Sequence, residues 1–379
     1  MPEIILNDLV KIFPYETAGL FASKRRKAKL AQQRSAAYTT NEGVVAVQHF
    51  SLEVKKGDFV VLLGPSGCGK TTVLRMIAGL EEPTLGTVTF DGKDMAAVPP
   101  ENRNTAMVFQ NYSLYPHLNV FENIAFPLKN AHIFRAELEE KVNEAAELMK
   151  LSDKLTRLPF ELSGGERQRV ALARSLVRNP DLFLMDEPFS NLDAPMRASL
   201  REYVKQMHRK TGASFVYVTH DRLEALSLAN KLVVMEDGII HQQGNPVDLY
   251  NRPVDAYVAG FLGLPLLNQF DGLRVKNGTV SVGGFAVPAH GIPEGTEVSV
   301  GIRPADVIPG EGEFSGRVRY TEPNGSDTVA HIDCGGTELI ALVSGTQPGS
   351  AFFPNSTVRF GIKEDRVLFF DKDGKTLQL

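Results

Sequence analysis

Residues 59–72 read FVVLLGPSGCGKTT, a short apolar run followed by a glycine-rich turn. The apolar run suits a buried parallel strand, and the spacing from Lys70 to Leu80 predicts a helix. The turn matches G-x-x-x-x-G-K-[ST] between strand and helix, the context in which backbone N–H groups and a helix N-terminus surround a phosphate chain. Lys70 would then reach the β and γ phosphates, and the Thr71 hydroxyl would bind Mg²⁺. An ordinary glycine turn is the alternative.

A second apolar run, LFLMDE at residues 182–187, ends in two acids. A carboxylate at the mouth of a sheet can hold Mg²⁺, and Asp186 is the candidate for this role. A second carboxylate could polarise an attacking water, and Glu187 is the candidate. Taken alone, an acidic strand end before Pro188 is more often a solvated turn. The phosphate-binding pattern upstream favours the catalytic interpretation.

Between these runs, residues 162–168 read LSGGERQ and open a predicted helix. Ser163 can cap that helix, and Gly164 and Gly165 expose backbone N–H groups at its positive end, which makes a second potential phosphate site. By physics alone, a plain capped helix start is favoured. Because one domain cannot easily aim two such sites at one γ-phosphate, the pattern indicates a dimer in which each chain supplies one half.

Short apolar runs and helical patterns alternate along the first two thirds of the chain. The further runs predicted as strands are residues 105–109, 181–185, 214–219 and 231–235, and the predicted helices are residues 138–151, 164–177, 194–208 and 221–229. This alternation predicts an α/β domain with a mainly parallel sheet. After about Phe261, short alternating strands separated by Asn-Gly and Gly-Gly turns predict an all-β module.

The composition is that of a folded globular chain. Its 379 residues, 43% hydrophobic and 23% charged, allow two or three domains. A net charge of -4 gives no overall attraction for nucleic acid or anionic lipid. Cys68 and Cys334 provide no disulfide framework and fit a reducing compartment. The start lacks the features of a secretory leader, and no apolar run approaches the length of a membrane helix, so any membrane role is expected to be peripheral.

The motifs GPSGCGKT, LSGGERQ and LFLMDEP, followed by SNLD at 190–193 and by Thr219-His220, together resemble the ABC ATPase family. The resemblance covers about residues 4–235 and implies ATP and Mg²⁺ as cofactors. It gives Gln110 the role of a glutamine that contacts Mg²⁺ and the water. It gives His220 the role of a switch histidine that touches the γ-phosphate, and Asp193 that of an acid that communicates across a homodimer.

The resemblance and the motif chemistry together define the expected site. The expected catalytic residues are Glu187, His220 and Gln110, and the expected metal ligands are Thr71, Gln110 and Asp186. The expected nucleotide-binding residues are Phe13, Gly64, Pro65, Ser66, Gly67, Cys68, Gly69, Lys70, Thr71, Thr72, Gln110, Ser163, Gly164, Gly165, Gln168, Asp193 and His220. In the family an aromatic side chain stacks on adenine; alignment of the first strand favours Phe13, with Tyr15 and Tyr38 as alternatives.

The resemblance also divides the chain. Residues 1–240 are expected to form the ATPase domain, with a basic insertion at 16–42 and a helical subdomain at 111–160. The insertion is better explained as a solvated loop or exposed helix than as a contact for lipid or nucleic acid. In the helical subdomain, the side chains expected to line a groove for a short helix of a transmembrane subunit, or to belong to the core, are Tyr112, Leu114, Tyr115 and Phe121.

Residues 241–379 are expected to form a linker and an OB-like, TOBE-type regulatory domain. Residues 301–307, GIRPADV, are similar to the G-I-R-P-E-D motif of carbohydrate importers, with Ala305 in place of the usual glutamate. This resemblance implies an ATP-hydrolysing importer subunit for a sugar, oligosaccharide or polyol. It implies a homodimer that is peripheral on the cytoplasmic face of the inner membrane, two transmembrane permease subunits and, indirectly, an extracytoplasmic solute-binding protein.

Other functions stay open at this point. Related ATPases serve importers of polyamine, iron or phosphonate, and soluble ABC proteins act on nucleic acid. The C-terminal stretch lacks the interleaved basic and aromatic residues that nucleic acid would need, so no such partner is expected. A simple P-loop kinase would leave residues 162–168 and His220 without a role.

Overall fold

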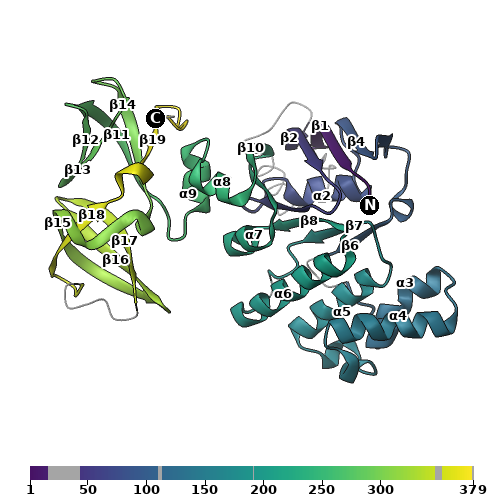
Figure 1. The fold of residues 1–379 in the computed structure, drawn as a ribbon. Helices are drawn as coiled ribbons and strands as arrows, with labels where there is room; N and C mark the ends of the chain where they lie inside the picture. Colours follow the sequence, from purple (N-terminus) through teal and green to yellow (C-terminus); the bar gives the residue numbers. More distant parts are fainter. Residues whose placement is uncertain (16–42, 110–112, 191, 346–351, 378–379) are drawn as a thin grey trace, which may run out of the picture. The chain divides into compact units, whose positions relative to one another are not determined.

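The computed structural model describes residues 1–15, 43–109, 113–190, 192–345 and 352–377. The chain divides into two compact units, Met1–Pro246 and Val247–Leu379, each with its own apolar core (Figure 1). Within the described ranges, no helix has both the length and the apolar character that crossing a bilayer requires.

The first unit contains two sheets. Its strands are β1 (Ile4–Pro14), β2 (Gly43–Val54), β3 (Phe59–Leu63), β4 (Leu85–Phe90), β5 (Lys93–Asp94), β6 (Thr105–Val108), β7 (Leu182–Asp186), β8 (Ser214–Thr219), β9 (Lys231–Glu236) and β10 (Ile239–Gly244). One sheet is antiparallel with the order β2-β1-β4-β5, and the other has the order β10-β9-β3-β8-β7-β6. The second sheet is parallel except for β10, which confirms the predicted mainly parallel sheet.

The helices of the first unit lie around this parallel sheet. They are α2 (Lys70–Ala78), α3 (Val120–Asn130), α4 (Arg135–Leu148), α5 (Gly164–Leu176), α6 (Ala194–Thr211) and α7 (Arg222–Leu228), with 3-10 turns at Pro100–Asn102, Ser152–Lys154 and Pro159–Glu161. Helix α2 contacts β2 of one sheet and β7 and β8 of the other, so it lies between them. Helices α3 and α4 pack on α5 and form a helical group at one side of the unit (Figure 1).

The strand order determines where the chemistry-bearing segments meet. Strand β3 pairs in parallel with β8, with Leu63 opposite Thr219, and β8 pairs in parallel with β7, with Val218 opposite Asp186. The chain therefore leaves three adjacent strands at one edge of the sheet. These strands are buried along almost their whole length because the sheet is covered on both faces, which explains their continuous apolar sequence.

The second unit is rich in β-structure. It begins with α8 (Pro246–Asn251) and α9 (Ala256–Leu262), and its strands are β11 (Asn268–Lys276), β12 (Thr279–Val282), β13 (Phe285–Pro288), β14 (Glu297–Ile302), β15 (Val307–Asn324), β16 (Asp327–Cys334), β17 (Thr337–Ser344), β18 (Thr357–Ile362) and β19 (Leu368–Phe370). Two sheets with the orders β13-β12-β11-β14-β19 and β17-β16-β15-β18 enclose one apolar core. The strand pairings among the described residues of this unit are all antiparallel, as the turn-rich sequence predicts.

Candidate functional site

The turn between β3 and α2, residues 64–71, is the phosphate loop. Gly69 occupies the N-cap of α2 with φ of 94°, a left-handed conformation that favours glycine. A Cβ atom at this position would lie 2.2 Å from the carbonyl oxygen of Ala46, so the loop also needs glycine for this close approach. A glycine-rich loop that leads into a helix N-terminus is the arrangement in which backbone N–H groups can bind a phosphate.

Lys70 is held inside the phosphate loop. The side chain is only 4% exposed, and its Nζ donates to the carbonyl oxygens of Gly64 at 2.8 Å and Pro65 at 2.7 Å. The Nζ also lies 3.6 Å from Sγ of Cys68, and burial raises the pKa of that thiol. Cys68 therefore contributes an uncharged thiol beside the Lys70 amine.

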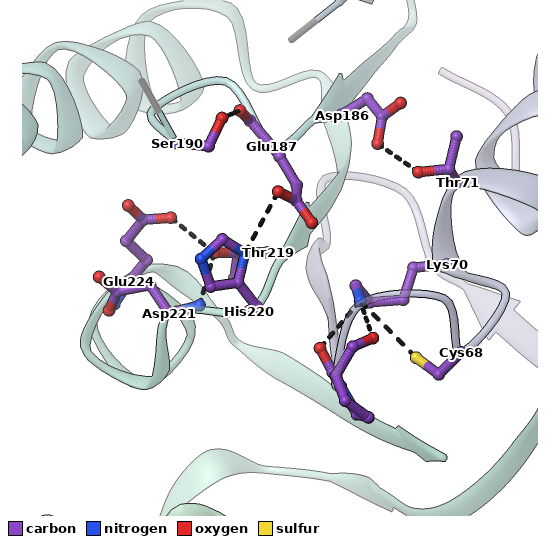
Figure 2. A network of polar contacts seen from close by, with 12 residues as sticks. Cys68, Lys70, Thr71, Asp186, Glu187, Ser190, Thr219, His220, Asp221 and Glu224 are labelled. Atoms are coloured by element: carbon purple, nitrogen blue, oxygen red, sulfur yellow. Dashed lines mark hydrogen bonds and ion pairs between the residues drawn. The ribbon is translucent and has the colours of Figure 1, made fainter. Parts of the chain in front are cut away.

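Two of the three expected metal ligands, Thr71 and Asp186, lie in the described part of the chain and contact each other. The Oγ1 of Thr71 donates to Oδ1 of Asp186 at 2.7 Å, and Asp186 is the last residue of β7 (Figure 2). Burial raises the pKa of the Asp186 carboxyl, while the hydrogen bond from Thr71 opposes that change. A hydroxyl and a carboxylate at this spacing supply the hard oxygen atoms that Mg²⁺ prefers.

Glu187 has a strained backbone. Its φ is 43°, in a region that residues with a Cβ rarely occupy, and such outliers cluster at functional sites. Hydrogen bonds on both sides maintain the conformation: the Glu187 amide donates to the carbonyl of Val218 at 3.0 Å, and its own carbonyl accepts from the Ser190 hydroxyl at 3.1 Å. The side chain turns toward His220, whose Nδ1 lies 3.2 Å from Oε2 of Glu187 (Figure 2).

These residues enclose one pocket of about 340 Å³. It is lined by Ala46, Ser66, Gly67, Gly69, Lys70, Thr71, Thr72, Asp186 and Glu187. Most of the sequence-predicted site on the phosphate loop and β7 is therefore brought together. Ala46, on β2, was missed as a site residue, because only the pairing of distant strands places it against the loop.

Residues 162–168, here called the signature segment, contain the N-cap and the first residues of α5. Ser163 is the N-cap of α5: its Oγ accepts from the Glu166 amide, and the Glu166 carboxylate accepts from the Ser163 amide, as the sequence predicted for a helix cap. Gly165 lies so close to α6 that an added Cβ would fall 2.3 Å from Sδ of Met196. No residue of this segment lines the phosphate pocket.

Gln168, an expected nucleotide-binding residue, lies on α5. Its side chain is fully buried, and neither amide atom has a hydrogen-bond partner among the residues that the structure describes. Gln168 does not line the phosphate pocket, and its contact with nucleotide stays a prediction. Asp193 is likewise engaged within the chain, because its Oδ1 accepts from the Met196 amide as the N-cap of α6.

The aromatic and loop residues expected from the family resemblance are only partly described. Phe13 lies on β1 opposite Val44, is 37% exposed, and does not line the phosphate pocket. Tyr15 is half-buried. Gln110, Tyr38, Tyr112 and the basic insertion 16–42 lie outside the described residues.

Three of the residues expected to line a groove on the helical subdomain are described by the structure, and their side chains are half-buried. Leu114, Tyr115 and Phe121 all fall in this class. The Tyr115 ring packs 4.3 Å from that of Phe126, and Arg174 of α5 donates to the carbonyl of Ser113 at 2.8 Å. The segment after β6 is thus tied directly to the helix that begins with the signature segment.

A phosphate loop, an acidic strand end and a histidine on adjacent parallel strands define a P-loop nucleotide hydrolase. The family described as ABC transporter matches residues 47–190, and the family described as TOBE domain matches residues 290–370. The chain belongs to the ABC transporter ATP-binding proteins, and it is an ABC-type ATPase subunit with a C-terminal TOBE domain.

Relatives along nearly the whole chain agree with this assignment. The chain is 43% identical over 355 residues to the trehalose/maltose import ATP-binding protein MalK of Thermococcus litoralis, covering 87% of this chain and 92% of the relative. It is 44% identical over 312 residues to the sn-glycerol-3-phosphate import ATP-binding protein UgpC of Cereibacter sphaeroides, covering 81% and 88%.

Solved structures give the same fold for the first unit. The dimeric post-hydrolysis structure of the ATP-binding cassette MJ0796, bound to ADP and Pi, is similar with a TM-score of 0.52 and 27% identity. The match covers 64% of this chain and 98% of that cassette.

Proposed function

We propose that this chain works as a homodimer that binds two MgATP molecules between its copies and hydrolyses them to drive import of a solute. The observation that carries the proposal is the split of phosphate-binding elements. Lys70, Asp186 and Glu187 share one pocket, whereas the signature segment, with its exposed Ser163, lies outside it. A second copy can complete the pocket with its own signature segment, and the dimeric MJ0796 cassette supports this arrangement.

Each residue of the pocket then has a defined task. Lys70 and the backbone of the phosphate loop bind the β and γ phosphates. Thr71 and Asp186 would hold Mg²⁺, which neutralises charge on the phosphate oxygens when bound, and Gln110 is proposed as a further ligand. In the structure the Thr71 hydroxyl donates to Asp186. When Mg²⁺ binds, the oxygen atoms of both side chains would turn toward the ion instead.

The Glu187–His220 pair is proposed to handle the water. The Glu187 carboxylate accepts the proton of the attacking water, and His220, 3.2 Å away, holds that carboxylate in place and contacts the γ-phosphate. Asp193 and the adjoining Leu192 are proposed to face the second copy. Ser163 and Gly165 of that copy would donate toward the γ-phosphate at the positive end of α5.

The relatives support a proposal for the partners. Import ATP-binding proteins for trehalose/maltose and for sn-glycerol 3-phosphate match this chain over most of their length. We therefore place it on the cytoplasmic face of the cell membrane with two permease subunits, indirectly served by an extracytoplasmic solute-binding protein. The proposed cargo is a sugar, oligosaccharide or polyol.

The Glu187→Gln variant tests the shared site. It keeps the size and one oxygen of the side chain but removes the base, so MgATP should still bind while turnover falls by at least about 100-fold. Sedimentation should then show a MgATP-dependent dimer. The control is Glu147→Gln, which changes an exposed acid on α4. Substantial residual turnover would show that Glu187 is not the base, and a monomer under every MgATP condition would reject the shared site.

The cargo is tested on the complex purified with its permeases and solute-binding protein. Maltose, trehalose or glycerol 3-phosphate should stimulate its ATP hydrolysis in proteoliposomes. Stimulation by spermidine, an iron chelate or a phosphonate instead would reassign the cargo class.

A further inference from the structure

One arginine on α6 contacts two functional segments at once. Arg197 lies in the first turn of α6, where side chains lean back toward the helix N-terminus. Its Nε donates to the carbonyl oxygen of Leu192 at 3.0 Å, and its Nη1 donates to Oδ2 of Asp221 at 3.1 Å. Its own amide donates to the carbonyl of Asp193 at 2.9 Å. The side chain therefore bridges the segment Leu192–Asp193 and the residue that follows His220.

The switch segment, Thr219–Asp221, is fixed on both sides of His220. On the N-terminal side, Oγ1 of Thr219 donates to the buried Glu224 carboxylate at 2.8 Å and accepts from the Asp221 amide at 2.9 Å (Figure 2). On the C-terminal side, Oδ1 of Asp221 accepts from the Glu224 amide as the N-cap of α7. His220 itself is left with a half-exposed side chain beside Glu187.

The bridge is better suited to setting geometry than to adding stability. The Arg197 and Asp221 side chains are 36% and 24% exposed, and ion pairs with such access to water contribute little to stability. The guanidinium is planar, however, and its donors have fixed directions. Two bonds from one such group therefore fix the distance between the two acceptors, the Leu192 carbonyl and the Asp221 carboxylate.

We propose that Arg197 is a positioning residue that couples the segment Leu192–Asp193 to the Glu187–His220 pair. The inference rests on the proposed function, in which Leu192–Asp193 faces the second copy. Contact with that copy moves or restrains this segment, Arg197 carries the restraint to Asp221, and His220 is thereby aligned with Glu187. Arg197 does not line the phosphate pocket, so its loss should lower kcat and leave ATP binding by the single chain intact.

Asp221→Asn is the sharpest single variant. The retained oxygen can still cap α7, but the amide group replaces Oδ2 and presents a donor to the donating Nη1 of Arg197. Arg197→Met removes both bonds, and Arg197→Lys keeps the charge with one nitrogen that cannot reach both acceptors. Arg209→Met is the matched control, because Arg209 lies on the same helix and is exposed.

The expected pattern is specific to positioning. With the full-length protein, Asp221→Asn, Arg197→Met and Arg197→Lys should each lower kcat by about 10- to 100-fold, with the KM for ATP and the affinity for trinitrophenyl-ATP changed less than threefold. The double variant Arg197→Met/Asp221→Asn should be no slower than the slower single variant, because both changes break one link. Thermal melting should stay near that of the Arg209→Met control.

The outcomes separate this inference from the proposed function. If the wild type hydrolyses ATP and Lys70→Ala abolishes hydrolysis, but Asp221→Asn keeps full kcat, the inference is overturned and the proposed function stands. The inference is also overturned if the double variant loses kcat by the product of the two single losses. It is overturned as well if the loss of kcat in each variant follows the loss of its melting temperature. If the wild type does not hydrolyse ATP at all, the proposed function fails first.

Discussion

The Nδ1 of His220 lies 3.2 Å from Oε2 of Glu187, although the two residues follow different strands, β8 and β7, of the parallel sheet. The contact depends on the left-handed backbone of Glu187, which turns the side chain out of the strand direction. His220 is 51% exposed at its side chain and Glu187 18%. The pair is thus open on the histidine side, where a γ-phosphate would approach.

Replacing His220 should separate catalysis from binding. His220→Ala removes the partner that holds Glu187, so kcat should fall by about 10²- to 10⁴-fold with little change in the affinity for ATP. Steady-state hydrolysis and equilibrium titration with a fluorescent nucleotide measure the two quantities. His290→Ala, at an exposed position of the second unit, is the control. A kcat within twofold of wild type would remove His220 from the mechanism.

Gly165→Ala should expose the tight packing of α5 on α6. The new Cβ would meet the Met196 side chain, and crowding of this kind costs about 1–3 kcal/mol of unfolding free energy. Adding Met196→Ala should recover most of that loss, which denaturant titration can measure. Gly260→Ala is the matched control, because nothing lies within 4 Å of its added Cβ. If the double variant is no more stable than Gly165→Ala, the crowding lies elsewhere.

Glu224 should make stability depend on pH. Burial raises the pKa of its carboxyl in the folded chain, although hydrogen bonds from Tyr217 and Thr219 oppose this change. The folded state therefore holds the proton more tightly than the unfolded state. Its stabilising contribution is complete below the unfolded-state pKa of about 4.3 and is lost as pH rises through the raised folded pKa.

Glu224→Gln removes this titration and keeps an acceptor oxygen. The unfolding free energy of the variant, minus that of the wild type, should rise with pH across this window by up to about 1.4 kcal/mol per pH unit, and then level off. Urea titrations at several pH values measure it. A difference that stays constant, or falls, would contradict the assigned direction of the pKa change.

Arg303 should be a stability centre of the second unit. It is 6% exposed, its guanidinium lies 4.0 Å from the Tyr250 ring centre, and it donates to the carbonyls of Tyr250 and Ala259. Arg303→Ala removes the donor to both carbonyls, of which the Ala259 contact is buried, and should cost about 2–4 kcal/mol of unfolding free energy. Arg303→Lys should recover only part, because it lacks the planar group. Arg274→Ala, at an exposed ion pair, should cost about 0–1 kcal/mol. Equal losses for both alanine variants would contradict this role.

Local patterns were sufficient for much of the site. The glycine spacing of residues 64–71 predicted a strand-to-helix phosphate loop, and the structure has β3 and α2 on its two sides. Ser163 was expected to cap a helix and does so. These features depend on a few adjacent residues, so their information is contained in one short stretch of sequence.

Other site features depend on distant pairing. Ala46 lines the pocket because its carbonyl lies against Gly69, and nothing in the sequence near Ala46 marks it. Gln168 belongs to a motif associated with nucleotide binding, yet the rotation of α5 buries its side chain completely. A motif specifies residue types at a spacing, but helix packing decides which of those side chains face solvent.

The class of chemistry could be predicted from the amino-acid sequence: a phosphate loop, two acids at a strand end, a histidine after another strand, and an α/β unit followed by a β-rich one. The three-dimensional fold was needed to show that Leu63, Asp186 and Thr219 end neighbouring strands, and that Arg197 joins Leu192 to Asp221. The physical reason is that periodicity and turn chemistry act over a few residues. Strand order and register instead arise from burying several apolar runs together, a property of the whole unit that no single run contains.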